Sequence, residues 1–166
     1  MPHLKTFFLV LVFSLSLHAD MFSEGSRSIG VKLGGASIGS EDYTIAGVSG
    51  NYFVLENLSV GLGYEKWFSG NPDIQKLTIE STYFIPASEN FRPYVGLLLR
   101  RIIIGSSDRI GENYDDTNAY GYRAGLAFTQ DRLLISVGVV QEKYDSTEGL
   151  FGDTETYAEV LVGFTF

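Results

Sequence analysis

Apolar and polar residues alternate with a period of two in eight separate segments of this chain, and this pattern constrains the fold more than any other feature. In each segment one set of alternate residues is free of charge and mainly apolar. The other set holds most of the glycines, small polar residues and charges. A period of two places successive side chains on opposite faces of a β-strand. The segments are residues 29–34, 46–54, 58–65, 76–85, 95–100, 120–128, 133–142 and 159–166.

The connections between these segments predict how the strands are joined. Three links are polar or contain proline, and two of the three are tight; they lie at residues 56–57, 86–93 and 129–132. The other links are richer in Gly, Asp, Glu and Asn and mostly longer; they lie at residues 39–42, 68–74, 106–117 and 145–153. Short and long links alternate when antiparallel strands run up and down with tight turns at one end.

The polar face of the strands indicates which side of the sheet faces inward. It carries eight ionisable residues: Lys32, Glu65, Lys76, Glu80, Arg100, Arg123, Glu142 and Glu159. Its many glycines suit a narrow, crowded lumen, because glycine in a strand marks close backbone approach. The uncharged face then contacts lipid, where only a closed sheet satisfies every backbone polar group. We predict an all-β fold, an eight-stranded antiparallel up-and-down transmembrane β-barrel; the alternative is a soluble barrel with its apolar face inside.

Aromatic residues near the strand ends are expected to form girdles at the two membrane interfaces. The candidates are Tyr43, Tyr52, Tyr64, Trp67, Tyr83, Tyr94, Tyr120, Phe128 and Phe166. Arg101 directly follows Arg100, so the two side chains face opposite sides of a strand. We expect Arg101 at the lipid headgroup boundary, where a long side chain can reach water, unless a bulge interrupts the strand.

The start of the chain has the order of a secretory signal. Lys5 precedes a largely apolar run over residues 6–17, and the small residue Ala19 suits a cleavage site. We predict a signal peptide over residues 1–19 and a barrel domain over residues 20–166. No later apolar run is long enough for a membrane-spanning helix.

Removal of this leader also removes both histidines, His3 and His18, and the chain has no cysteine. A Ser–His–acid site needs an imidazole to accept the proton of the nucleophile, so this chemistry is not expected. A serine with Lys66 or Lys143 as base remains an alternative, although no serine is marked as its partner. We predict no enzymatic activity, no cofactor and no metal. A net charge of −8 without a Lys/Arg run argues against nucleic acid as a partner.

The links over residues 106–117 and 145–153 are acidic and are the expected contact regions for lipopolysaccharide, a host ligand or neighbouring cells. Their acidic residues are Asp108, Glu112, Asp115, Asp116, Asp145, Glu148 and Asp153. Clusters of oxygen ligands can bind Ca²⁺, which would also bridge to lipopolysaccharide phosphates. Residues 108–116 lack the spacing of a calcium loop, so solvated loop charge is the favoured interpretation.

Several motifs together resemble the small outer-membrane barrels of the OmpA/OmpX type. They are PASENFRPYVG at residues 86–96, GYRAGL at residues 121–126 and the terminal run YAEVLVGFTF, added to the leader and the strand pattern. The resemblance covers the whole mature chain and implies export to the outer membrane of a Gram-negative bacterium, in contact with its lipid. It also implies that the barrel-assembly machinery reads the final aromatic and the alternating residues before it, namely Phe166, Phe164, Val162 and Val160.

Four of the lumen charges are predicted to share one level in the barrel. Glu80, Arg100, Arg123 and Glu159 each lie six or seven residues from one of the polar or proline-containing links or from the chain end. Two carboxylates and two guanidinium groups would neutralise one another there, which is similar to the charged cluster that obstructs the lumen of OmpA-like barrels. The predicted role is structural or surface-interacting. The alternatives are a narrow ion or small-solute channel and, less favoured, a lipid A-modifying enzyme.

Overall fold

The computed structural model describes residues 21–38, 41–105, 115–145 and 153–166, so the predicted signal peptide lies outside it. Within these ranges no helix is long and apolar enough to cross a membrane. The described residues form the strands β1 (Arg27–Ile38), β2 (Glu41–Leu55), β3 (Leu58–Phe68), β4 (Ile74–Phe84), β5 (Phe91–Ile104), β6 (Thr117–Gln130), β7 (Leu133–Tyr144) and β8 (Thr154–Thr165).

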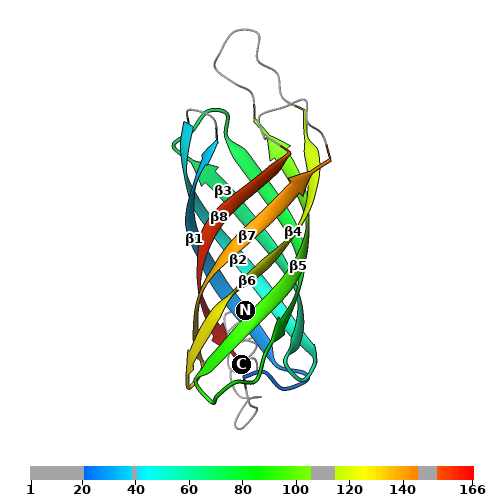
Figure 1. The fold of residues 1–166 in the computed structure, drawn as a ribbon, viewed down its shortest axis with the longest axis vertical. Helices are drawn as coiled ribbons and strands as arrows, with labels where there is room; N and C mark the ends of the chain where they lie inside the picture. The colour runs from blue at the N-terminus through cyan, green and yellow to red at the C-terminus, as the bar shows by residue number, and fades with distance from the viewer. Residues whose placement is uncertain (1–20, 39–40, 106–114, 146–152) are drawn as a thin grey trace, which may run out of the picture.

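Every strand pairs antiparallel with the next one in the chain, and β8 pairs with β1 to close the barrel (Figure 1). The predicted eight-stranded up-and-down barrel is therefore confirmed. We call the end that holds the links β2–β3, β4–β5 and β6–β7 the turn end, and the opposite end the loop end. The first loop-end link is shorter than predicted, because β2 already begins at Glu41.

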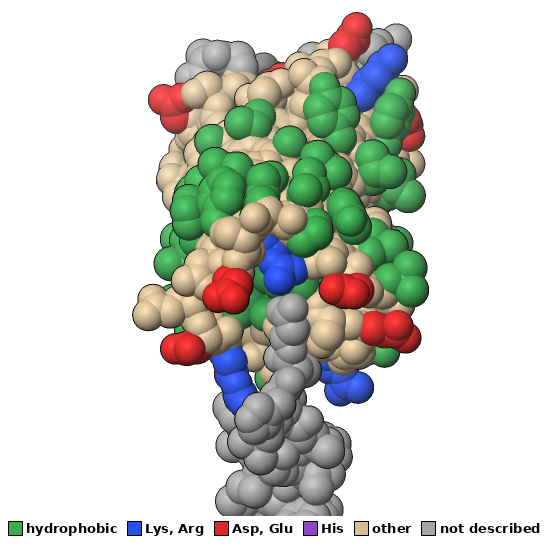
Figure 2. All heavy atoms as spheres, turned by 60° about the horizontal axis from the view of Figure 1, so that its bottom comes forward, with side chains coloured by type: hydrophobic (Ala, Val, Ile, Leu, Met, Phe, Trp, Pro, Cys, Tyr) green, Lys and Arg blue, Asp and Glu red, His purple; other side chains and the backbone are tan. Residues whose placement is uncertain are grey.

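The barrel wall is apolar outside and polar inside. Leu62, Ile79 and Leu97 are 67%, 61% and 70% exposed on the outer surface, whereas the eight ionisable residues of the inward face are buried. Hydrophobic side chains cover the visible face of the wall, and charged side chains gather towards its ends (Figure 2). This distribution is the inverse of that in a soluble barrel and is the arrangement of a barrel that spans a membrane.

Three of the aromatic residues predicted for the interface girdles point into the lumen instead. Tyr43, Trp67 and Tyr94 are buried, because each occupies an inward-facing position of its strand. The alternation along a strand decides the face, and nearness to the strand end does not override it. The outward aromatics are Tyr52, Tyr64, Tyr83, Tyr120 and Phe128, which are exposed, and Phe166, which is partly exposed.

Arg101 lies on the outer wall as predicted from its adjacency to Arg100, and no bulge interrupts β5 at this point. Arg100 pairs with Thr78 and Arg101 with Leu77 in continuous register. The Arg101 side chain is half-exposed, and its guanidinium forms an ion pair with Asp116 at 3.2 Å. The irregularity in the sheet lies elsewhere, in β2 between Phe53 and Leu55.

Candidate functional site

The structure places all eight ionisable residues of the inward face inside the barrel, each at most 6% exposed. They come from seven of the eight strands: Lys32 from β1, Glu65 from β3, Lys76 and Glu80 from β4, Arg100 from β5, Arg123 from β6, Glu142 from β7 and Glu159 from β8. We call these eight residues the lumen charges. Charges taken out of water at this depth need partners of opposite sign.

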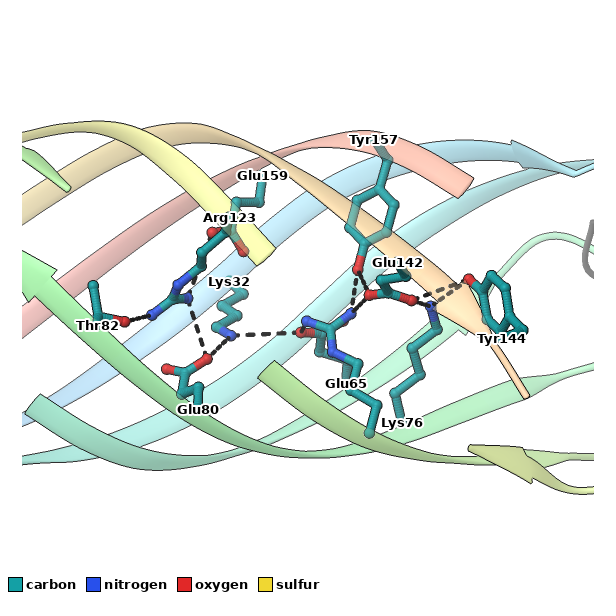
Figure 3. Close-up of polar contacts among 11 residues, drawn as sticks. Lys32, Glu65, Lys76, Glu80, Thr82, Arg123, Glu142, Tyr144, Tyr157 and Glu159 are labelled. Carbon is teal, nitrogen blue, oxygen red and sulfur yellow. Dashed lines mark hydrogen bonds and ion pairs between the residues drawn. The ribbon is translucent and has the colours of Figure 1, made fainter. Parts of the chain in front are cut away.

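The half of this set nearer the turn end is organised around Arg123 and Lys32 (Figure 3). Arg123 Nη1 lies 3.5 Å from Glu159 Oε1 and 3.1 Å from Glu80 Oε2. Its second terminal nitrogen donates a hydrogen bond of 2.5 Å to the Thr82 hydroxyl. Lys32 Nζ donates to the same Glu80 oxygen at 2.9 Å, so Glu80 is shared between two cations.

The second half continues from Lys32 towards the loop end. Lys32 Nζ lies 3.6 Å from Glu65 Oε1, and Arg100 Nη2 lies 2.9 Å from the same oxygen. Arg100 Nη1 also pairs with Glu142 Oε1, and Lys76 Nζ lies 2.8 Å from Glu142 Oε2. The Arg100 guanidinium therefore bridges two carboxylates, which its planar, forked geometry favours.

Linked in order, the lumen charges form a continuous series in which acid and base alternate. The series runs Glu159, Arg123, Glu80, Lys32, Glu65, Arg100, Glu142 and Lys76. Four carboxylates face four cations, so the formal charge of the set is zero. Each internal member has a partner of opposite sign on both sides. We call this arrangement the ion-pair chain.

The structure joins three of the four residues predicted to share one level, Glu80, Arg123 and Glu159, and gives Arg100 other partners. Arg123 contacts Glu80 and Glu159, whereas Arg100 contacts Glu65 and Glu142 farther towards the loop end. Counting residues from the turns treats the strands as parallel to the barrel axis. In a small barrel the strands are tilted, so equal counts on different strands give different heights.

Inward-facing tyrosines and a tryptophan complete the loop-end half. Tyr144 and Tyr157 are not among the predicted site residues, and Trp67 lies in the lumen and not in the predicted girdle. The Tyr157 hydroxyl accepts from Arg100 and donates to Glu142, and the Tyr144 hydroxyl donates to Glu142 at 3.0 Å. Lys76 Nζ lies 4.0 Å from the centre of a Trp67 ring, a cation–π contact. These residues belong to the inward-facing set of alternate positions in their strands, and this pattern is the sequence feature that could have identified them.

Glycine leaves the room that the larger lumen side chains occupy. A Cβ atom on Gly47 would lie 2.7 Å from Glu65 Cγ on the neighbouring strand. A Cβ atom on Gly121 would overlap the carbonyl oxygen of Gln141 and lie 3.0 Å from Glu142 Cα. Both glycines are therefore required by close approach of the strands that carry the ion-pair chain.

Apolar clusters lie on both sides of the ion-pair chain. Buried residues of the loop-end cluster are Ile38, Tyr43, Ile45, Trp67, Ile74, Leu98, Ile102, Ala119, Val140, Tyr144 and Tyr157. The turn-end cluster comprises Met21, Phe22, Phe53, Phe84, Tyr94, Ala127, Leu134 and Leu161. An internal cavity of about 30 Å³ lies between the turn-end cluster and Arg123. The described side chains thus fill the lumen in three layers: apolar, charged and apolar.

The predicted contact residues of the outer loops are only partly described. Asp115, Asp116, Asp145 and Asp153 are exposed at the loop end, whereas Asp108, Glu112 and Glu148 lie outside the described residues. The Asp116 carboxylate forms an ion pair with Arg101 and accepts a hydrogen bond from the Ile104 backbone N–H at 3.2 Å. Among the residues that the structure describes, no three acidic, histidine or cysteine side chains are grouped to hold a metal ion.

The expected assembly signal comprises Val160, Val162 and Phe164 on one face of β8 and Phe166, which directly follows the strand. Val160 and Phe164 are exposed on the outer wall, and Val162 and Phe166 are partly exposed there. Their alternation places all four side chains on the apolar outer surface, next to the exposed residues of β1 and β7.

Single substitutions at the adjacent residues Arg100 and Arg101 compare the contribution of a buried ion pair with that of an exposed one. Arg100→Ala leaves Glu65 and Glu142 without their shared cation in the lumen, so we expect the free energy of unfolding to fall by about 3–5 kcal/mol. Arg101→Ala removes a surface pair and should cost about 0–1 kcal/mol. Urea unfolding of the barrel in lipid vesicles measures both values. Equal losses for the two variants would contradict the buried bridge.

No family model and no curated protein sequence matches the chain. Among solved structures, the N-terminal β-barrel domain of Pseudomonas aeruginosa OprF matches with a TM-score of 0.68 at 18% identity, over 86% of this chain and 98% of that one. The outer membrane protein OprG from the same organism matches with a TM-score of 0.55 at 14% identity, over 87% and 97%. A de novo designed transmembrane β-barrel matches with a TM-score of 0.58 at 14% identity, over 87% and 98%. These likenesses show the fold alone: the chain has the fold of the small eight-stranded outer-membrane β-barrels of the OmpA/OmpX type.

Proposed function

We propose that this protein is a non-enzymatic β-barrel of the outer membrane of a Gram-negative bacterium, reached after export by the predicted signal peptide. The observation that carries the proposal is the inverted distribution of side chains, with exposed leucines and valines around the wall and ion pairs inside. Such a surface is unstable in water and suits a lipid environment. The likeness to OprG, an outer membrane protein, supports the same location.

The proposed role is structural and surface-interacting, with the turn end in the periplasm and the loop end outside the cell. Short periplasmic turns and longer outer loops are the usual arrangement in such barrels. The exposed carboxylates at the loop end, Asp115, Asp145 and Asp153, would meet lipopolysaccharide phosphates through divalent cations or contact a host or cell-surface ligand. The barrel-assembly machinery is the proposed partner of the β8 face.

The filled lumen argues against the alternative of a narrow channel. Two apolar clusters and the ion-pair chain occupy it in succession, so a solute would have to displace buried, paired side chains. The lipid A-modifying alternative lacks a histidine base once the leader is removed. Lys66, one of the two lysines considered as a substitute base, forms an ion pair with Asp73 at 3.1 Å.

Cell fractionation tests the proposed location. The protein is expected to sediment with the outer membrane and to migrate faster in gel electrophoresis before heating than after it, because a closed barrel stays folded in detergent until heated. Recovery of the intact chain in the soluble fraction, with no heat-dependent migration, would overturn the proposal.

Bilayer recording tests the closed lumen. The purified barrel is expected to give no steady conductance in a planar bilayer, because the three lumen layers leave no continuous path for ions. A general porin inserted by the same protocol serves as the positive control. Steady, large-pore conductance of the unmodified protein would favour the channel alternative.

A charge-neutralised loop end tests the surface role. The combined variant with Asp115, Asp145 and Asp153 changed to Asn is expected to bind lipopolysaccharide vesicles several-fold more weakly in Ca²⁺, because cation bridging needs carboxylates. Neutralisation of the exposed turn-end residues Glu56, Glu89 and Asp131 removes the same number of carboxylates from the opposite end and is the matched control. Binding that changes equally in both variants, or in neither, would show that the loop-end carboxylates do not mediate binding to lipopolysaccharide.

A further inference from the structure

A short segment before the barrel, residues 21–26, lies across the turn end of the lumen; we call it the N-terminal segment. Its Phe22 side chain is 1% exposed. The Phe22 ring lies edge-on to Phe53 with the ring centres 5.7 Å apart, and it packs against Phe84 at 4.8 Å. The guanidinium carbon of Arg92 lies 4.1 Å from the centre of the same ring. One aromatic side chain thus fills the space between β2, β4 and β5 at this end.

Backbone hydrogen bonds hold the N-terminal segment against the β2–β3 hairpin. The Asn57 N–H donates to the Phe22 carbonyl at 2.8 Å, and the Gly25 N–H donates to the Phe53 carbonyl at 2.9 Å. The Phe53 N–H donates in turn to the Ser26 carbonyl at 2.9 Å. Gly25 has a φ of 87°, a left-handed conformation that glycine adopts without steric cost and that turns the chain into β1. The position of Phe22 is therefore set by the backbone as well as by ring packing.

The internal cavity of about 30 Å³ lies next to this aromatic layer, on the lumen side. Its lining includes hydroxyl groups of Ser59, Thr82, Ser136 and Thr165, with Arg123 of the ion-pair chain. A cavity of this volume accommodates one or two water molecules, and each needs two to four polar partners, which these groups supply. Among the described side chains, none forms a hydrogen bond with the buried Thr165 hydroxyl. The size and the hydroxyl groups of the lining suit water.

We infer that the N-terminal segment is a plug, with Phe22 as its sealing side chain, that separates a small hydrated chamber in the lumen from water at the turn end. The inference goes beyond the proposed function, because it concerns whether water and small reagents can enter the lumen of the folded barrel, and not the location or the surface contacts of the barrel. Loss of the Phe22 ring would uncover Phe53 and Phe84, whose side chains also line the chamber. The ion-pair chain remains the barrier beyond it.

Single-cysteine labelling tests the plug. The chain contains no cysteine, so Ser59→Cys introduces one thiol into the chamber at a residue that is 2% exposed. Methyl methanethiosulfonate, a small neutral reagent, is applied to the folded barrel purified in detergent, and the rate of thiol modification is measured. Phe22→Ala is expected to raise this rate about tenfold or more, because a local opening replaces a sealed layer.

Two controls distinguish loss of the plug from general loosening. Phe128→Ala removes a ring of the same size from the outer wall and should leave the Ser59→Cys rate unchanged. Ile102→Cys reports on the loop-end cluster, and Phe22→Ala should not change its rate. If Phe22→Ala does not fold, Phe22→Leu takes its place and should give a smaller increase in the same direction. Equal chamber rates with and without the Phe22 ring, or an equal increase at Ile102→Cys, would overturn the inference.

Discussion

The rest of this structure depends on the pairing of charge inside a narrow, closed sheet. Moving a single ion from water into such an interior costs several kcal/mol, and only a partner of opposite sign with good geometry offsets that cost. The lumen charges meet this condition by alternating in sign from Glu159 to Lys76. Because seven strands contribute them, the series is complete only when the whole barrel has closed in the observed register. The ion-pair chain therefore ties the charge balance of the lumen to the correct pairing of the strands.

Neighbouring features follow from the same constraint. A lumen crossed by long charged side chains needs small residues beside them, and Gly47 and Gly121 provide this space. The remaining inward positions near the two ends hold large apolar and aromatic residues, which keep bulk water away from the ion pairs. Exclusion of water strengthens the attraction between the paired charges. Removing one partner of a buried ion pair therefore lowers the free energy of unfolding more than removing one partner of a surface pair.

The strand pattern predicted the fold and the inward position of all eight lumen charges, because side-chain alternation in a strand depends only on local geometry. The partners within the chain could not be predicted in the same way. Arg100 pairs with Glu65 and Glu142 because of strand tilt, which is a property of the closed barrel and not of any one segment. Phe22 carried no signal either, since residues 21–26 do not alternate and their place is set by contacts with distant hairpins. The surface role could not be predicted from the fold. A designed barrel shares this fold, so the fold by itself does not specify a function.

A double-mutant cycle between Lys32 and Glu80 tests the central claim, that the lumen charges act as linked pairs, most directly. Their side chains meet at 2.9 Å in the middle of the series and are almost fully buried. Lys32→Met, Glu80→Gln and the double variant are compared by their free energies of unfolding in lipid vesicles. The account predicts a coupling energy of about 1–3 kcal/mol, with the double variant less destabilised than the sum of the single ones. Additive losses, within about 0.3–0.5 kcal/mol, would show that the two charges are buried independently and would contradict the ion-pair chain.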